Sequence, residues 1–177
     1  MFAFPATASA TTVELSGPTL LVTADASEHN DLFVVHVFAG EPATSQFYIT
    51  EQGTDATMTA GAGCTPDPGT TYQAYCPTAG ITAVEVRTLD LADKAFIQTN
   101  GISPAVTVLA GTGSDEVQGG DNTGEKIKGG KGHDVLMGGG FADLDPMDIL
   151  IGGSGRDKLS GQGGVDMLKA LDGSATS

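Results

Sequence analysis

The C-terminal third of the chain repeats a nine-residue pattern, and this repeat constrains the fold more than any other feature. Aligned on its glycines, the sequence from residue 110 divides into six units that share the pattern G-G-x-G-x-D-x-U-x, where U is a large aliphatic residue. Units two and four depart from the pattern, because Glu125 replaces the Asp of unit two and unit four carries an insertion. The units are Ala110–Gln118, Gly119–Lys128, Gly129–Met137, Gly138–Ile151, Gly152–Ser160 and Gly161–Lys169. A fixed period of this kind predicts a stack of similar structural units.

The residue types in each unit indicate a cation site. Glycines at positions one, two and four permit backbone angles that other residues avoid, so the chain turns tightly and points its carbonyls inward. The Asp at position six adds a carboxylate to the same small space. Calcium takes about six to eight oxygen ligands, and backbone carbonyls serve as well as carboxylates. Each turn is therefore a candidate part of a calcium site.

The residues after each turn predict a three-residue strand with one inward side chain. The expected inward set is Val117, Ile127, Leu136, Leu150, Leu159 and Leu168. Because one such strand buries almost no apolar surface, the units must stack into a two-layered parallel roll. Two units then make one coil, and the turns of units n and n+2 lie above each other.

This stacking divides the turns between two edges. The odd edge holds the turns of units one, three and five, and its candidate ligands are Asp115, Asp134 and Asp157 with the glycines Gly111, Gly113, Gly130, Gly132, Gly153 and Gly155. The even edge holds the turns of units two, four and six, with Glu125, Asp148 and Asp166. We expect two calcium ions on the odd edge and at most one on the even edge, between units four and six.

The repeated pattern resembles the RTX, or hemolysin-type calcium-binding, nonapeptide-repeat family of secreted bacterial proteins. The resemblance covers about 60 residues, and four closely fitting copies make it specific. It implies a right-handed parallel β-roll, or β-helix solenoid, that is disordered where calcium is scarce and folds on binding Ca²⁺ outside the cell. The alternative is a flexible Gly-Asp linker with local Asx turns, but linkers rarely keep an aliphatic residue two positions after every Asp.

Residues 11–109 predict an all-β region. Six short alternating or β-branched runs are each followed by a turn-forming residue: Thr12–Leu15, Thr19–Thr23, Leu32–Phe38, Gln46–Thr50, Ile81–Arg87 and Val106–Leu109. The region is expected to continue the solenoid or to form a small β-sandwich. It is similar, more loosely, to the degenerate β-rich segment that precedes RTX repeats, and Ala26–Val34 would then be a worn repeat.

Two features bear on the cellular compartment. Cys64 and Cys76 are the only cysteines, and they form either a disulfide or two buried thiols. A disulfide would stabilise the fold by roughly 2–3 kcal/mol in the chain-entropy model, and it would favour an oxidising, extracellular setting. Residues 1–10 end in Ala8-Ser9-Ala10, which fits either the remnant of a signal peptide or an ordinary alanine-rich terminus.

Charge and motifs exclude several functional classes. The chain has 22 acidic and 8 basic residues, a net charge of −14, so it has no electrostatic route to nucleic acid or anionic lipid, and cations are its natural partners. No apolar run approaches the length of a transmembrane segment. The sequence contains no H-E-x-x-H or G-x-S-x-G motif, so we predict no catalysis. The acidic run 143–148 lacks the Gly and Glu of an EF-hand loop, which favours a solvated loop.

The sequence therefore predicts an extracellular calcium-binding protein whose roll is a structural or surface module. Two alternatives remain open. In the first, Phe33, Phe38, Phe47 and Tyr48 form a glycan-binding face of an adhesin, although core packing is the favoured role for these rings. In the second, the chain is the C-terminal piece of a larger secreted enzyme or toxin, because the ending Leu171–Ser177 offers no polar cap to the last coil.

Overall fold

Every regular element in the described part of the chain is a β-strand, which confirms the predicted all-β class. The structure is a computed structural model, and it describes residues 10–26, 28–37, 45–53, 56–100, 102, 104–121, 124–140 and 146–171. No helix in these ranges is long and apolar enough to cross a membrane. The predicted features at residues 1–9, Phe38, 141–145 and 172–177 lie outside the described residues.

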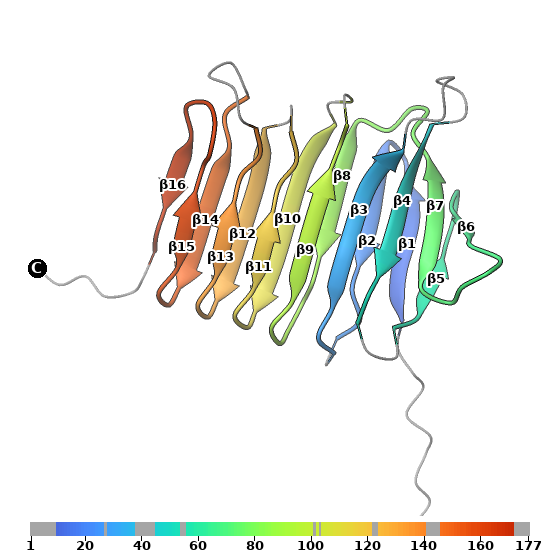
Figure 1. Ribbon diagram of the computed structural model, residues 1–177, viewed down its shortest axis with the longest axis horizontal. Helices are drawn as coiled ribbons and strands as arrows, with labels where there is room; N and C mark the ends of the chain where they lie inside the picture. Colours follow the sequence, from blue (N-terminus) through green and yellow to red (C-terminus); the bar gives the residue numbers. More distant parts are fainter. Residues whose placement is uncertain are drawn as a thin grey trace, which may run out of the picture.

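The strands form two eight-stranded sheets. Sheet A contains β1 (Thr11–Ser16), β2 (Thr19–Thr23), β5 (Met58–Ala60), β8 (Ala83–Arg87), β10 (Ala105–Thr112), β12 (Glu125–Lys131), β14 (Ile149–Ser154) and β16 (Met167–Lys169). Sheet B contains β3 (Asp31–Val37), β4 (Gln46–Glu51), β6 (Thr65–Pro66), β7 (Gln73–Pro77), β9 (Lys94–Gln98), β11 (Glu116–Gln118), β13 (Val135–Met137) and β15 (Lys158–Ser160). Figure 1 shows the strands side by side in two layers along the long axis.

From β8 onward the chain alternates between the two sheets, and each strand pairs in parallel with the strand two further along. In sheet A the parallel order is β8, β10, β12, β14 and β16, and in sheet B it is β9, β11, β13 and β15. One strand of each sheet with its connecting turns makes one coil. The register places Val117 beside Leu136 and Leu136 beside Leu159, so the aliphatic position of each unit recurs at one level of the stack.

The core is a row of mainly aliphatic side chains between the sheets. Of the residues that the sequence predicts to face inward, Val117, Ile127, Leu136 and Leu150 are buried, and Leu159 is partly buried against them. Burying one such side chain fully is worth about 1.5–3 kcal/mol. Leu168 differs from the prediction, because it is 47% exposed. It lies in β16, the last strand of sheet A, where no further strand of the described chain covers it.

The two sheets continue through residue 110 toward the N-terminus. Strand β8 also pairs in parallel with β2, and β9 pairs in parallel with β3. Next to them the pairing changes to antiparallel, because β1 folds back on β2 and β4 folds back on β3, and at the edge of sheet A β1 pairs in parallel with β5. Gly17, with φ +61°, lies in the tight turn between β1 and β2. The N-terminal strands therefore share the sheets and the core of the repeats.

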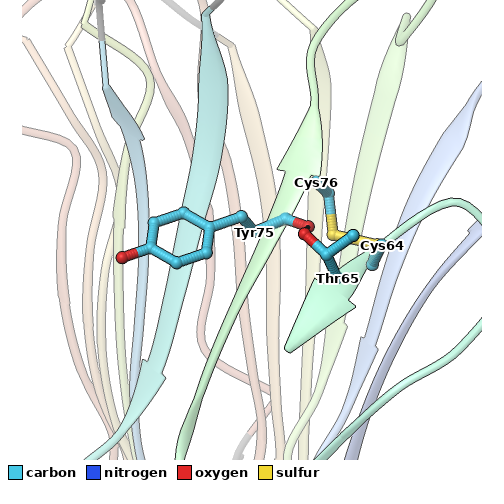
Figure 2. Close-up of a disulfide and its surroundings, with 4 residues drawn as sticks. All are labelled: Cys64, Thr65, Tyr75 and Cys76. Atoms are coloured by element: carbon cyan, nitrogen blue, oxygen red, sulfur yellow. Dashed lines mark hydrogen bonds between the residues drawn. A yellow bond between two sulfur atoms is a disulfide. The ribbon is translucent and has the colours of Figure 1, made fainter. Parts of the chain in front are cut away.

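The disulfide between Cys64 and Cys76 is present, so the alternative of two buried thiols is wrong. Figure 2 shows it joining the residue before β6 to the fourth residue of β7. Beside it, the hydroxyl of Thr65 donates a hydrogen bond to the carbonyl oxygen of Tyr75, at 3.5 Å. The bridge thus ties the short edge strand β6 to sheet B.

The six predicted runs correspond to β1, β2, β3, β4, β8 and β10. The largest difference is at β10, which extends three residues past the predicted end at Leu109, into the first turn of the repeats. The prediction missed β5, β6, β7 and β9. Strands β5 and β6 are only three and two residues long. Strands β7 and β9 have five residues each but lack the β-branched runs on which the prediction relied.

Candidate metal centre

The turns of the odd edge lead from sheet A to sheet B and stack closely on one another. Residues 111–115, 130–134 and 153–157 form these turns, and Gly111, Gly130 and Gly153 are register partners. A Cβ atom on Gly132, which has a φ of +138°, would lie 1.4 Å from the carbonyl oxygen of Gly113. The carbonyl of one turn therefore occupies the space of a side chain in the next, and only glycine permits this approach.

The aspartates of these turns form a ladder of hydrogen bonds. The Asp115 amide donates to Oδ1 of Asp134 at 3.0 Å, and the Asp134 amide donates to Oδ1 of Asp157, also at 3.0 Å. Asp115 and Asp134 are buried, and Asp157 is partly buried. One oxygen of each carboxylate thus fixes the side chain to the preceding turn.

The second oxygen of each carboxylate makes no hydrogen bond. Oδ2 of Asp115, Asp134 and Asp157 is buried without a donor. In units three and five the glycine before the turn makes room for this oxygen, because a Cβ on Gly129 would lie 2.2 Å from Oδ2 of Asp134, and a Cβ on Gly152 would lie equally close to Oδ2 of Asp157. A buried carboxylate oxygen without a partner is unfavourable. The arrangement therefore fits a hard divalent cation, which binds carboxylate and carbonyl oxygens.

The electrostatics of the odd edge also favour a cation. Burial raises the pKa of Asp115, and with smaller contributions from the charges of Asp134 and Asp93 the pKa reaches about 6. Burial likewise raises the pKa of Asp134, with a further contribution from Asp157. The ion pairs of the described residues, Arg87 with Glu85 and Lys94 with Glu116, include none of these aspartates. The row of carboxylates therefore has no basic side chain paired with it in the described chain.

The even edge is built differently. At Asp148, Oδ1 accepts from the Glu125 amide at 2.8 Å and Oδ2 accepts from the Gly139 amide at 3.1 Å. The Asp148 amide in turn donates to Oδ1 of Asp166 at 3.0 Å. Burial raises the pKa of Asp148 despite these hydrogen bonds. Because both oxygens of Asp148 already accept backbone hydrogen bonds, its carboxylate offers less to a cation than those of the odd edge.

The Glu that interrupts the repeat in unit two is accommodated by its length. Glu125 is buried, and its Oε1 accepts a hydrogen bond from the amide of Gly120 at 3.3 Å. Unit two is one residue longer than the nine-residue pattern, and the longer side chain of Glu125 still reaches this amide. The Asp-to-Glu change and the extra residue thus fit each other.

One odd-edge carboxylate was not predicted from the sequence. Asp93 precedes β9, and its amide donates to Oδ1 of Asp115 at 2.9 Å, so it continues the ladder by one turn toward the N-terminus. Asn30 continues it further, because its amide donates to Oδ1 of Asp93 at 2.7 Å. In the sequence, Asp93 and Asn30 share one feature with the repeats: an aliphatic residue two positions later, Ala95 and Leu32 respectively. They lack the glycines that identify the other turns, so the pattern could not be recognised.

No three side chains of the types His, Cys, Asp and Glu gather into a metal-binding group in the described ranges. A cation on the odd edge would therefore be held by carboxylates from two successive turns together with backbone carbonyl oxygens. Glycine-rich turns supply such carbonyls, and calcium accepts them readily.

Comparison with known proteins identifies the repeats. Residues 126–145 and 147–176 match the family model described as the RTX calcium-binding nonapeptide repeat, in four copies. The match begins within unit two and includes units three to six, while unit one and the whole N-terminal region lie ahead of it. No curated protein and no solved structure matches the chain. The family resemblance seen in the sequence is thus confirmed over its C-terminal part.

Proposed function

We propose, from the premise that residues 126–145 and 147–176 are RTX calcium-binding nonapeptide repeats, that this chain is an extracellular calcium-binding module. In this proposal the strands form a right-handed parallel β-roll that folds on binding Ca²⁺ and serves as a structural or surface element without a catalytic step. The observation that carries it is the row of buried Oδ2 atoms without a donor at Asp115, Asp134 and Asp157.

On the odd edge, Asp115, Asp134 and Asp157 would hold two ions between successive turns. Backbone oxygens would come from the turn glycines, which are Gly111, Gly113, Gly130, Gly132, Gly153 and Gly155. Asp148 and Asp166 are the corresponding residues of the even edge. The ion pairs of the described residues include none of these aspartates, so bound calcium would supply the positive charge beside them. Asp134 lies in the middle turn, so it would contribute to both odd-edge ions.

The same features support folding that depends on calcium. Without an ion, the stacked carboxylates repel one another, and the glycines carry a large conformational entropy in the unfolded chain. An ion that binds only the folded form stabilises it by about 2.7 kcal/mol when its free concentration is about 100 times its dissociation constant. Two ions at that level would contribute stabilisation comparable to the whole stability of a small domain.

An extracellular location agrees with two observations. The chain contains the Cys64–Cys76 disulfide. Disulfides form and persist in oxidising compartments and are rare in the cytosol. The repeat family that the chain matches binds calcium, and free calcium is abundant outside cells. A structural or surface role is proposed because the sequence contains none of the hydrolase or metalloprotease motifs named above.

The test is far-UV circular dichroism during a calcium titration, with magnesium as the control ion. We expect β-sheet signal to increase with calcium alone. Asp134→Asn keeps a side-chain oxygen to accept the hydrogen bond from the Asp115 amide but removes one charge, and it should shift the titration to at least tenfold higher calcium. Asp121→Asn is the matched control, because Asp121 lies in a partly exposed turn outside the odd edge. A protein that is fully folded in chelator and does not respond to calcium would overturn the proposal.

A second candidate function, glycan binding, is favoured by one hollow at the N-terminal end. A hollow of about 540 Å³ lies beside β4 and β7, and two tyrosines and two glutamines are among its lining residues: Tyr48, Tyr72, Gln52 and Gln73. Tyr72 is 40% exposed. The predicted aromatic face itself is divided, because Phe47 is fully buried while Phe33 packs against Phe96 on the outside of sheet B. A glycan array probed with wild-type protein and with Tyr72→Ala tests this candidate, and binding that Tyr72→Ala leaves unchanged would count against it.

A further inference from the structure

The turn that joins β8 to β9, residues 88–93, stacks directly on the first turn of the repeats. The Thr88 hydroxyl donates to the Ala110 carbonyl at 2.8 Å, and the Thr112 amide donates to the Leu89 carbonyl at 3.0 Å. Asp90 forms an isolated parallel bridge with Thr112. This register places Leu89 beside Gly111, Leu91 beside Gly113 and Asp93 beside Asp115.

The backbone of this turn copies the glycine turns without containing glycine. Leu89 and Leu91 have φ values of +74° and +67°, in the left-handed region that residues with a Cβ rarely adopt. Both side chains are exposed, at 37% and 40%, so neither leucine is held there by apolar packing. The carbonyl oxygen of Leu91 lies so close to Gly113 that a Cβ there would be 1.3 Å away. Strained backbone of this kind is typical of ligand-binding turns.

The carboxylate of Asp93 has the same environment as those of the repeats. Its Oδ1 accepts hydrogen bonds from the Asn30 amide at 2.7 Å and the Asn30 side chain at 3.2 Å. Its Oδ2 is buried without a donor, as is Oδ2 of Asp115 in the next turn, and both residues are only 2% exposed. The nearby basic side chain is the exposed His29, whose Nδ1 lies 2.8 Å from the Ala92 carbonyl oxygen.

We propose that a further calcium site lies between residues 88–93 and 111–115, held by Asp93 and Asp115 with carbonyl oxygens of the two turns. The site lies ahead of the segment that matches the repeat family. It rests on the proposed function, because Asp115 would be shared with the first ion of the repeats. The odd edge then binds three ions rather than two.

Equilibrium dialysis of the full-length chain against calcium tests the proposal by counting bound ions. Asp93→Asn keeps an oxygen to accept the Asn30 hydrogen bonds but removes the charge, and it should bind one calcium ion fewer than the wild type. Asp90→Asn is the matched control, because it removes the same charge from the same turn at a side chain that is not among the proposed ligands and leaves the backbone carbonyls in place. It should bind as many ions as the wild type.

Thermal unfolding and circular dichroism separate a metal ligand from a residue needed only for structure. In calcium, Asp93→Asn should unfold at a lower temperature than the wild type. In chelator, its β-sheet signal in far-UV circular dichroism should equal or exceed that of the wild type, because a buried charge has been removed. A loss in both conditions, or an unchanged ion count in Asp93→Asn, would overturn the inference.

Crystals of wild-type protein grown in strontium give a second reading that needs no variant. An anomalous peak between the turns of Asp93 and Asp115 supports the site, and peaks at the later turns alone overturn it while the proposed function stands. A wild-type protein that binds no calcium in dialysis would overturn the proposed function and this site together. The two failures are therefore distinguishable.

Discussion

Gly132→Ala tests how closely the odd-edge turns are stacked. Its Cβ would lie 1.4 Å from the Gly113 carbonyl oxygen, whereas ordinary contact begins near 3.4 Å. Both atoms belong to backbone, so the clash can be relieved only if the two turns separate by about 2 Å. That movement breaks two hydrogen bonds between the turns, from the Gly113 amide to Lys131 and from the Asp115 amide to Asp134.

The magnitude follows from these contacts. The two hydrogen bonds, one of them to a carboxylate, are together worth about 2–4 kcal/mol. Alanine at a φ of +138° adds about 1–2 kcal/mol of backbone strain. We therefore expect Gly132→Ala to lower the free energy of unfolding by about 4 kcal/mol, which is a large share of the stability of a domain this size.

The matched control is Gly17→Ala. Gly17 also has a positive φ, +61°, but an added Cβ would meet no atom within 4 Å. Gly17→Ala should therefore lower the free energy of unfolding only by the backbone strain, about 1 kcal/mol. Urea unfolding in saturating calcium, followed by far-UV circular dichroism, measures both variants. If Gly132→Ala loses no more free energy of unfolding than Gly17→Ala, the close stacking of the turns is refuted.

Three further perturbations have defined outcomes. Replacing Cys64 and Cys76 by Ala should lower the free energy of unfolding in urea by roughly 2–3 kcal/mol without changing the number of calcium ions in dialysis, and a reduced ion count would contradict the separation of the two features. Glu51→Ala leaves three donors without their acceptor, the amides of Asp31 and Gly53 and the hydroxyl of Thr11, and should cost about 3 kcal/mol in the same assay, with Glu51→Gln losing less. In chelator the β-sheet signal of the wild type should rise as the pH falls from about 6 toward 3.8, because the folded form binds a proton at Asp115 with a raised pKa. Asp115→Asn should show a smaller rise over this window, and an equal rise would show that other groups are responsible.

The sign of the pH effect is set by the direction of the shift. A carboxyl whose pKa is higher in the folded than in the unfolded chain binds more protons when folded. Protonation of Asp115 therefore stabilises the calcium-free form, fully below 3.8, and this contribution is lost as the pH rises through about 6. Above that pH range, bound calcium would balance the charge of the Asp115 carboxylate in place of the proton. Acid and calcium are thus expected to replace each other in part.

The sequence predicts the strands and turns of the repeats because one residue type has one role at each position. Glycine marks the left-handed positions of the turn, and the aliphatic residue after Asp marks the buried strand, so Val117 and Leu136 could be placed in the core from spacing alone. Six of the strands, including β2 and β10, were predicted from alternating runs. The stacking of Asp134 between Asp115 and Asp157 follows from the period.

Other parts were not predictable because their cause is not local. The turn at 88–93 adopts left-handed angles at Leu89 and Leu91, and nothing in the identity of leucine indicates them. The neighbouring turn imposes this conformation through backbone hydrogen bonds. The change from parallel to antiparallel pairing at β2 and β3 likewise depends on which strand is already in place. The backbone angles of this turn and the direction of strand pairing therefore depend on neighbouring coils that are distant in the sequence.

The source of stability changes along this single stack. At the N-terminal end the fully buried side chains are large and numerous, and they include Leu20, Leu32, Phe47 and Ile49. At the C-terminal end Leu159 is only partly buried and Leu168 is exposed, while every odd-edge turn contains paired glycines and an aspartate. Within the repeats Ile127, Leu136 and Leu150 are still fully buried, so the proposed calcium sites add to apolar burial there, and burial is lost only at the last coils. The repeat family matches only residues 126–145 and 147–176, although the sheets extend much further. Sequence similarity follows the turn chemistry, which needs particular residues, whereas the parallel pairing of the earlier coils requires only that the core be filled.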